Sequence, residues 1–160
     1  MNGKLYSLRK SFAYAINGIV FCVRYERNMR IHLTIFAYVM FFSLFFYNFT
    51  RAELILLVLT CAFVMALEIV NTAIEVLTDR ASPKPHPLAK VAKDTAAGAV
   101  LVSAVTAVIV GVILFWDLEI LREIGMFFIS NIAALIALLA SVGLSVVFIF
   151  FTGKERKKNL

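Results

Sequence analysis

Four polar side chains interrupt the apolar segment that ends E-I-V-N-T-A-I-E-V-L-T-D. They are Glu68, Asn71, Glu75 and Asp79. In an α-helix, which turns by about 100° per residue, all four lie on one face, within roughly 80° of one another. A carboxylate inside a bilayer costs on the order of 2.5–3.5 kcal/mol. This face must therefore point toward a protein interior, water or a bound cation rather than toward lipid.

Oxygen-rich side chains of this kind suit a magnesium–nucleotide site. Mg²⁺ prefers oxygen ligands, keeps several waters and is held by one or two carboxylates together with substrate phosphates. A glutamate placed deeper, away from water, is a plausible general base, and inside the membrane boundary it would meet the hydroxyl of a lipid. Neither the P-loop nor the kinase glycine loop occurs in the sequence. A small proton or ion transporter is the alternative, since acidic stripes also form relays, but the other apolar stretches carry no acid.

The composition shows what kind of protein must position this stripe. The chain has 160 residues, of which 62% are hydrophobic and 16% charged, and four stretches are long enough to cross a bilayer. The net charge of +6 lies before, between and after these stretches. That placement is typical of membrane topology, so we expect membrane lipids as partners and no nucleic acid.

The hydrophobic pattern predicts an all-α integral membrane protein. Residues 4–25 carry an apolar stripe between basic residues and predict an amphipathic helix on the membrane surface. Spans are expected at about 31–47, 53–80, 95–116 and 124–151, and alternating prolines at 83, 85 and 87 exclude helix after the second span. We divide the chain into a surface helix (1–30), a three-span core (31–120), and an additional span with a basic tail (121–160).

The basic residues also predict an orientation. The N-terminal segment, the 80–93 loop and the tail are rich in Lys and Arg, whereas the two other loops hold one such residue each. The positive-inside rule places both termini and the proline loop in the cytoplasm. Glu26, Lys84, Lys93, Asp94 and the end of the acidic stripe then share one side of the membrane and can converge.

Three sequence blocks carry a family resemblance. E-R-N-M-R-I-H, E-I-V-N-T-A-I-E-V-L-T-D-R and H-P-L-A-K-V-A-K-D-T-A-A-G-A occur in this order over a region of about residues 5–116. They closely resemble the prokaryotic diacylglycerol kinase and undecaprenol kinase family. The resemblance implies a homotrimeric kinase of the bacterial inner membrane that uses ATP and Mg²⁺ and phosphorylates a lipid alcohol at sites between subunits. The first and third blocks favour undecaprenol as the substrate; diacylglycerol, giving phosphatidic acid, is the alternative.

The resemblance also implies roles for individual residues. Glu68 resembles the catalytic base, and Glu26 and Glu75 resemble a metal-coordinating pair that also contacts the nucleotide. The further nucleotide contacts that it implies are Tyr14, Lys84, Pro85, His86, Lys93 and Asp94, with Asn71 and Asp79 as other polar members of the site. Ser7 stands where some relatives carry an arginine, and Arg9 or Lys10 is a possible substitute.

The fourth span lies outside the resemblance and is given no role by it. It offers small residues for helix packing but no acid or base. We expect it to pack at the periphery of a trimer and to be dispensable for chemistry.

Overall fold

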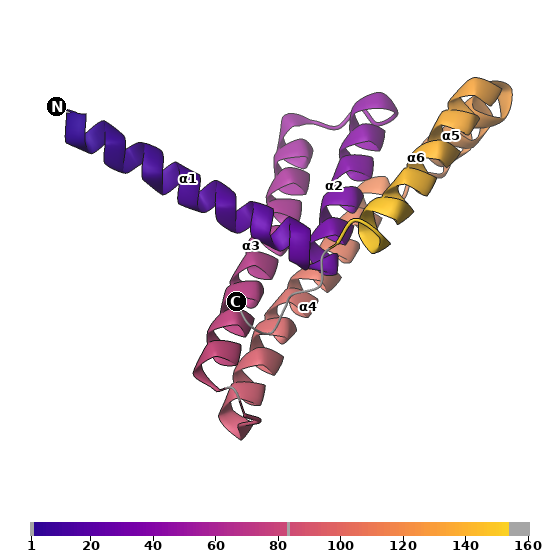
Figure 1. Ribbon diagram of the computed structural model, residues 1–160. Helices are drawn as coiled ribbons and strands as arrows, with labels where there is room; N and C mark the ends of the chain where they lie inside the picture. The colour runs from indigo at the N-terminus through magenta and orange to yellow at the C-terminus, as the bar shows by residue number, and fades with distance from the viewer. Residues whose placement is uncertain (1, 83, 154–160) are drawn as a thin grey trace.

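The computed structural model describes residues 2–82 and 84–153, with side chains from Leu8 onward. The described residues confirm the predicted all-α fold and form six helices (Figure 1). These helices are α1 (Asn2–Tyr25), α2 (Arg27–Phe45), α3 (Arg51–Ala81), α4 (Pro87–Phe115), α5 (Leu118–Ser130) and α6 (Ile132–Phe150). The side chain of Ser7 and the basic tail from residue 154 lie outside the described part.

Four of these helices, α2, α3, α4 and α6, are long and apolar enough to cross a membrane. The 31 residues of α3 give a helix of about 46 Å, which exceeds the roughly 30 Å hydrocarbon core of a bilayer. An upright α3 would extend beyond the bilayer by about one third of its length, and α4 packs along it. Helix α1 contacts α2 and α3, crosses α3 near its middle and extends away from the other helices (Figure 1).

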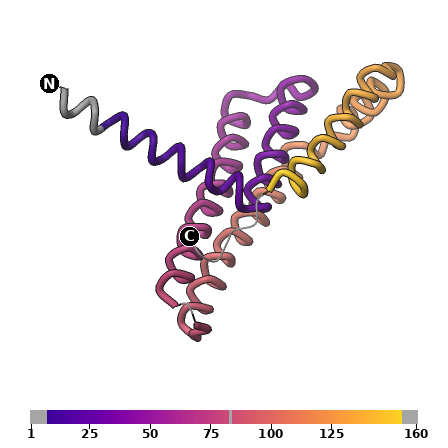
Figure 2. The backbone as a smooth tube through the Cα atoms, in the orientation of Figure 1, coloured from indigo at the N-terminus to yellow at the C-terminus, as the bar shows by residue number. Residues whose placement is uncertain are grey.

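The helices that cross the membrane pack in a row. Helix α4 packs along α3, α3 contacts α2, and α2 contacts α6, an arrangement that can be followed along the backbone in Figure 2. Small residues allow the close approach of α4 to α3, where Ala96 and Ser103 are buried. Because α2 and α4 both lean on α3, a groove remains between them with α3 as its floor.

The fourth apolar stretch differs from the sequence prediction, which was wrong in giving one helix over 124–151. The structure has two helices, α5 and α6, and Asn131 separates them. The backbone N–H of Asn131 donates to Phe127 O (3.0 Å) and ends α5, while its Oδ1 accepts from the N–H of Ala134 (3.1 Å) and begins α6. A capping asparagine inside an uncharged run is a local signal that hydropathy alone does not reveal.

Helix α6 runs antiparallel to α2 and is joined to it by polar contacts. The hydroxyl of Tyr38 lies 2.9 Å from Ser141 Oγ and 3.1 Å from Ser145 Oγ. At the other end of α2, Phe42 contacts Phe128 of α5 edge to face, and Phe46 contacts the same ring in a tilted arrangement. The added helices are therefore docked specifically, with hydroxyl pairs that fix the register of α6 on α2.

Candidate functional site

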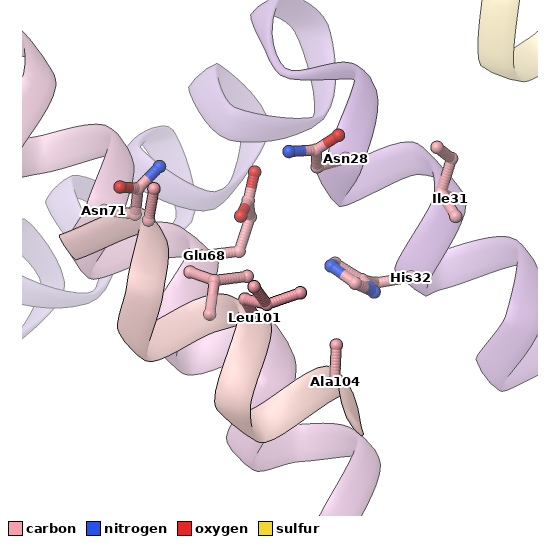
Figure 3. Close-up of a pocket in the computed structure, with 9 residues that line it drawn as sticks. Asn28, Ile31, His32, Glu68, Asn71, Leu101 and Ala104 are labelled. Carbon is pink, nitrogen blue, oxygen red and sulfur yellow. The ribbon is translucent and has the colours of Figure 1, made fainter. Parts of the chain in front are cut away.

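A pocket of about 230 Å³ opens in the groove between α2 and α4. Figure 3 shows how side chains from α2, α3 and α4 converge on it. Its lining consists of Asn28, Ile31, His32, Glu68, Asn71, Ala97, Val100, Leu101 and Ala104. Small residues on the α4 side leave the space open, and the polar groups of the pocket come from α2 and α3.

Glu68 forms the floor of this pocket and is almost completely buried, with 2% of its surface exposed. Its carboxylate lies between Asn71 and Asn28 (Figure 3), and Asn28 provides a side-chain hydrogen bond to it. Among the described side chains, two buried oxygens lack a hydrogen-bond partner: Glu68 Oε2 and Asn71 Oδ1. Both are acceptors, so the pocket is suited to a ligand that brings a hydroxyl group or a cation.

Two further carboxylates, those of Glu75 and Glu26, interact electrostatically with Glu68. Glu75 lies about two turns further along α3, where its Oε1 accepts from Asn71 Nδ2 (3.1 Å). Glu26 is the single residue between α1 and α2. Both act electrostatically on Glu68, so the structure brings together the three acids that the sequence placed in one site.

The extension formed by the ends of α3 and α4 carries the remaining charged candidates. Asp79 of α3 and Lys93 of α4 form an ion pair. Lys84, Pro85 and His86 are exposed in the turn between these helices, about 20 Å along α3 from Glu68 at 1.5 Å per residue. His86 also caps α4, because its Nδ1 accepts from the N–H of Leu88 (3.2 Å).

Not every sequence candidate reaches the pocket within one chain. Tyr14 lies on α1 with 69% of its surface exposed and is absent from the pocket lining. Asp94 is exposed on α4. In the described part of the chain, no three His, Cys, Asp or Glu side chains form a ready-made metal site. The carboxylates alone thus do not enclose a cation in this chain.

Sequence reasoning missed two polar residues of the pocket, Asn28 and His32. They lie four residues apart on α2 and therefore on one helical face. The sequence prediction started the first span at Ile31, whereas α2 begins at Arg27. Had the helix been extended through the block E-R-N-M-R-I-H, their shared face would have been visible.

The chain is similar to known membrane lipid kinases. The family model for prokaryotic diacylglycerol kinase matches residues 13–115. Undecaprenol kinase of Bacillus subtilis is 41% identical over 106 residues, covering 66% of this chain and 85% of that protein. Diacylglycerol kinase of Synechocystis is 43% identical over 107 residues, covering 66% of this chain and 60% of that protein.

More distant members extend the comparison. Diacylglycerol kinase of Haemophilus influenzae is 31% identical over 110 residues, covering 68% of this chain and 92% of that protein. No solved structure shows significant similarity to the chain. The matched region contains Glu26, the acidic stripe of α3 and the lining of α4, and leaves α5 and α6 outside it. The chain therefore belongs to the prokaryotic diacylglycerol kinase family of membrane lipid kinases.

Proposed function

We propose that this kinase transfers the γ-phosphoryl group of ATP to the hydroxyl of undecaprenol, with Glu68 as the general base and Mg²⁺ as the metal. The observation that carries this proposal is the unpaired Oε2 of Glu68, buried on the floor of a lipid-accessible groove. An acceptor without a donor is suited to the hydroxyl of an incoming alcohol.

The reaction needs one proton transfer and one phosphoryl transfer. Glu68 accepts the proton of the lipid hydroxyl as the oxygen forms a bond to the γ-phosphorus. The bond between the γ-phosphorus and the β,γ-bridging oxygen breaks, and ADP leaves with its electron pair. The products are a lipid monophosphate and ADP, and the proton on Glu68 returns to water. Asn28 positions the carboxylate through its hydrogen bond.

Glu26 and Glu75 are the residues that would hold magnesium. Both offer oxygen ligands, as does the unpaired Asn71 Oδ1, and this donor set fits Mg²⁺. When bound, the metal neutralises charge on the β- and γ-phosphates. The hydrogen bond from Asn71 Nδ2 to Glu75 Oε1 (3.1 Å) also orients the Glu75 carboxylate.

The nucleotide would lie along the extension of α3 and α4, outside the membrane. Lys93 and Lys84 provide positive charge there, next to Pro85, His86 and Asp94, with Asp79 holding Lys93 in place. Tyr14 is exposed on α1 and does not line the pocket of its own chain. In a homotrimer it would belong to a nucleotide site shared with a neighbouring subunit.

Undecaprenol is the preferred substrate in this proposal because most of the pocket wall is aliphatic. Ile31, Val100 and Leu101 line it and suit a hydrocarbon chain with a single hydroxyl at its end. Diacylglycerol would also bury two ester groups that need hydrogen-bond donors.

The membrane orientation is part of the proposal. We place the protein in the bacterial inner membrane with the α1–α2 junction and the α3–α4 extension in the cytoplasm. The basic residues at these positions support this orientation, and ATP is available on that side.

A lipid-dependent kinase assay tests the function. The purified protein is given labelled ATP with undecaprenol or diacylglycerol in separate reactions, and the matched control is Glu68→Gln. We expect magnesium-dependent labelling of undecaprenol that exceeds labelling of diacylglycerol and is lost in the control. Preferential labelling of diacylglycerol would refute the substrate assignment. Proton passage in vesicles, without labelling of any lipid alcohol, would favour the transporter alternative.

A further inference from the structure

Arg30 is a buried arginine that connects three helices. Only 5% of its surface is exposed. Its Nη1 donates to Val23 O (3.0 Å) and Arg24 O (3.3 Å) in the last turn of α1. Its Nε donates to Ile149 O (3.0 Å) near the end of α6. The Arg30 guanidinium donates to backbone carbonyls at the C-terminal ends of α1 and α6. This position is favourable for a cation, because the C-terminal end of a helix carries partial negative charge.

These bonds cross the junction that carries Glu26. Arg30 lies in the first turn of α2, and its bonds to Val23 and Arg24 hold the end of α1 against that turn. Glu26 is the single residue between the two helices, with an extended backbone (φ −105°, ψ 117°). The angle between α1 and α2 therefore sets where the Glu26 carboxylate points. The guanidinium that fixes this angle is itself held by α6.

Two neighbouring contacts show that the end of α6 and the residues just after it are fitted to this place. The guanidinium of Arg27 lies over the ring of Phe150, 5.9 Å from its centroid. Gly153 packs so closely on Arg30 that an added Cβ would overlap Nη2 and lie 2.6 Å from Cζ. A side chain at position 153 would therefore displace the guanidinium from its three carbonyl partners.

We infer that α6 is a positioning element for the kinase site, and that it acts through Arg30 on the junction that presents Glu26. The expectation that the extra span is dispensable for chemistry is replaced by this inference. It rests on the proposed role of Glu26 as a metal ligand. The family match ends at residue 115, so the α6 contact is an addition to the region that the chain shares with its relatives.

The test compares two glycine substitutions in the full-length protein. Gly153→Ala displaces the Arg30 guanidinium, whereas Gly143→Ala adds the same methyl group within α6 with nothing inside 4 Å. The measurement is equilibrium binding of a fluorescent ATP analogue as a function of Mg²⁺ concentration, which needs no turnover. We expect Gly153→Ala to raise the half-saturating Mg²⁺ concentration by roughly three- to tenfold, a shift of up to about 1.4 kcal/mol. Gly143→Ala should match the parent protein.

A double-mutant cycle separates positioning from a general loss of stability. Glu26→Gln should raise the half-saturating Mg²⁺ concentration by itself, and Gly153→Ala should add little in that background, because both changes act on the same ligand. Arg30→Met should reproduce Gly153→Ala without being additive to it. Thermal midpoints are recorded for every variant to exclude unfolded protein.

The outcomes distinguish this inference from the proposed function. If Glu26→Gln shifts the Mg²⁺ dependence and Gly153→Ala does not, the positioning role of α6 is wrong and the metal assignment stands. If Glu26→Gln leaves the Mg²⁺ dependence unchanged, the metal assignment itself is wrong. Equal effects of Gly153→Ala in the parent and Glu26→Gln backgrounds would also overturn the inference, because the perturbation would not pass through Glu26.

Discussion

Replacing the buried carboxylate of Glu68 should stabilise the protein while abolishing its activity. In Glu68→Met an unbranched apolar side chain of similar length occupies the same space. An unsatisfied buried polar atom costs about 1–3 kcal/mol, and a carboxylate in the membrane costs on the order of 2.5–3.5 kcal/mol. Since Asn28 already pairs with the Glu68 carboxylate, we expect the lower range, a gain of roughly 1–3 kcal/mol in the free energy of unfolding.

The assay is unfolding by a denaturing detergent at a fixed protein concentration, combined with lipid kinase activity. Activity should fall by about 100-fold or more, the contribution of a general base. The control is Thr72→Val, a change of similar volume at a buried position whose hydroxyl donates to Glu68 O in its own helix (2.9 Å) and also bonds with the Cys22 thiol of α1. Its unfolding free energy should stay within about 1 kcal/mol of the parent. A Glu68→Met protein less stable than the parent would refute the view that the buried carboxylate of Glu68 lowers the free energy of unfolding.

Three further predictions concern contacts outside the pocket. Tyr38→Phe should lower the unfolding free energy by about 0.5–1.5 kcal/mol. This loss should not add to the loss caused by Ser141→Ala plus Ser145→Ala, because all three substitutions disrupt the same cluster of hydroxyl groups. Additive losses of unfolding free energy would contradict this prediction. Lys93→Met should change the unfolding free energy by less than about 1 kcal/mol, since its ion pair with Asp79 is partly exposed, but it should weaken ATP binding. The charge-swapped double variant Asp79→Lys with Lys93→Asp should not restore ATP binding. Full recovery of ATP binding in that variant would show that only the ion pair matters. Burial, together with the charge of Asp117, raises the pKa of Tyr47. The contribution of Tyr47 to the free energy of unfolding is therefore present below the pKa of about 10 that tyrosine has in the unfolded chain, and it is lost as pH rises through the pKa of Tyr47 in the folded protein. The measurement is the free energy of unfolding between about pH 9 and 11. Its decrease with pH should be smaller in Tyr47→Phe, and it should be unchanged in Tyr14→Phe, a substitution at an exposed position. Equal pH dependence in the two variants would refute the assignment of this loss to Tyr47.

Much of the site followed from the sequence because its spacing fixes helical faces. Glu68, Asn71 and Glu75 were predicted on one face of one helix. In the structure Glu68 and Asn71 line the pocket, and Glu75 is hydrogen-bonded to Asn71. The position of Glu26 beside them is a tertiary relation, since it depends on how α1 and α2 meet. Helical periodicity does not predict that Glu26 belongs to this site, and the family resemblance did.

The parts that escaped prediction have local physical reasons. Asn28 and His32 were missed because hydropathy places the start of a span where the apolar run begins, whereas the helix starts at its cap, Glu26. The break at Asn131 was missed because one polar residue hardly changes the average over a long apolar run. The contacts of Arg30 could not be predicted, since its partners are backbone carbonyls and one of them, Ile149 O, lies 119 residues away in the sequence.

The Asn131 junction determines how this region tolerates changes in chain length. One residue ends α5 and begins α6, so there is no slack between the two helices. An inserted residue would rotate α6 by about 100° relative to α5. The serine face would then turn away from Tyr38, and the carbonyl of Ile149 would leave Arg30. Unlike most connections between helices, this one should accept substitutions more readily than insertions or deletions, and its length should be as constrained as the interior of a helix.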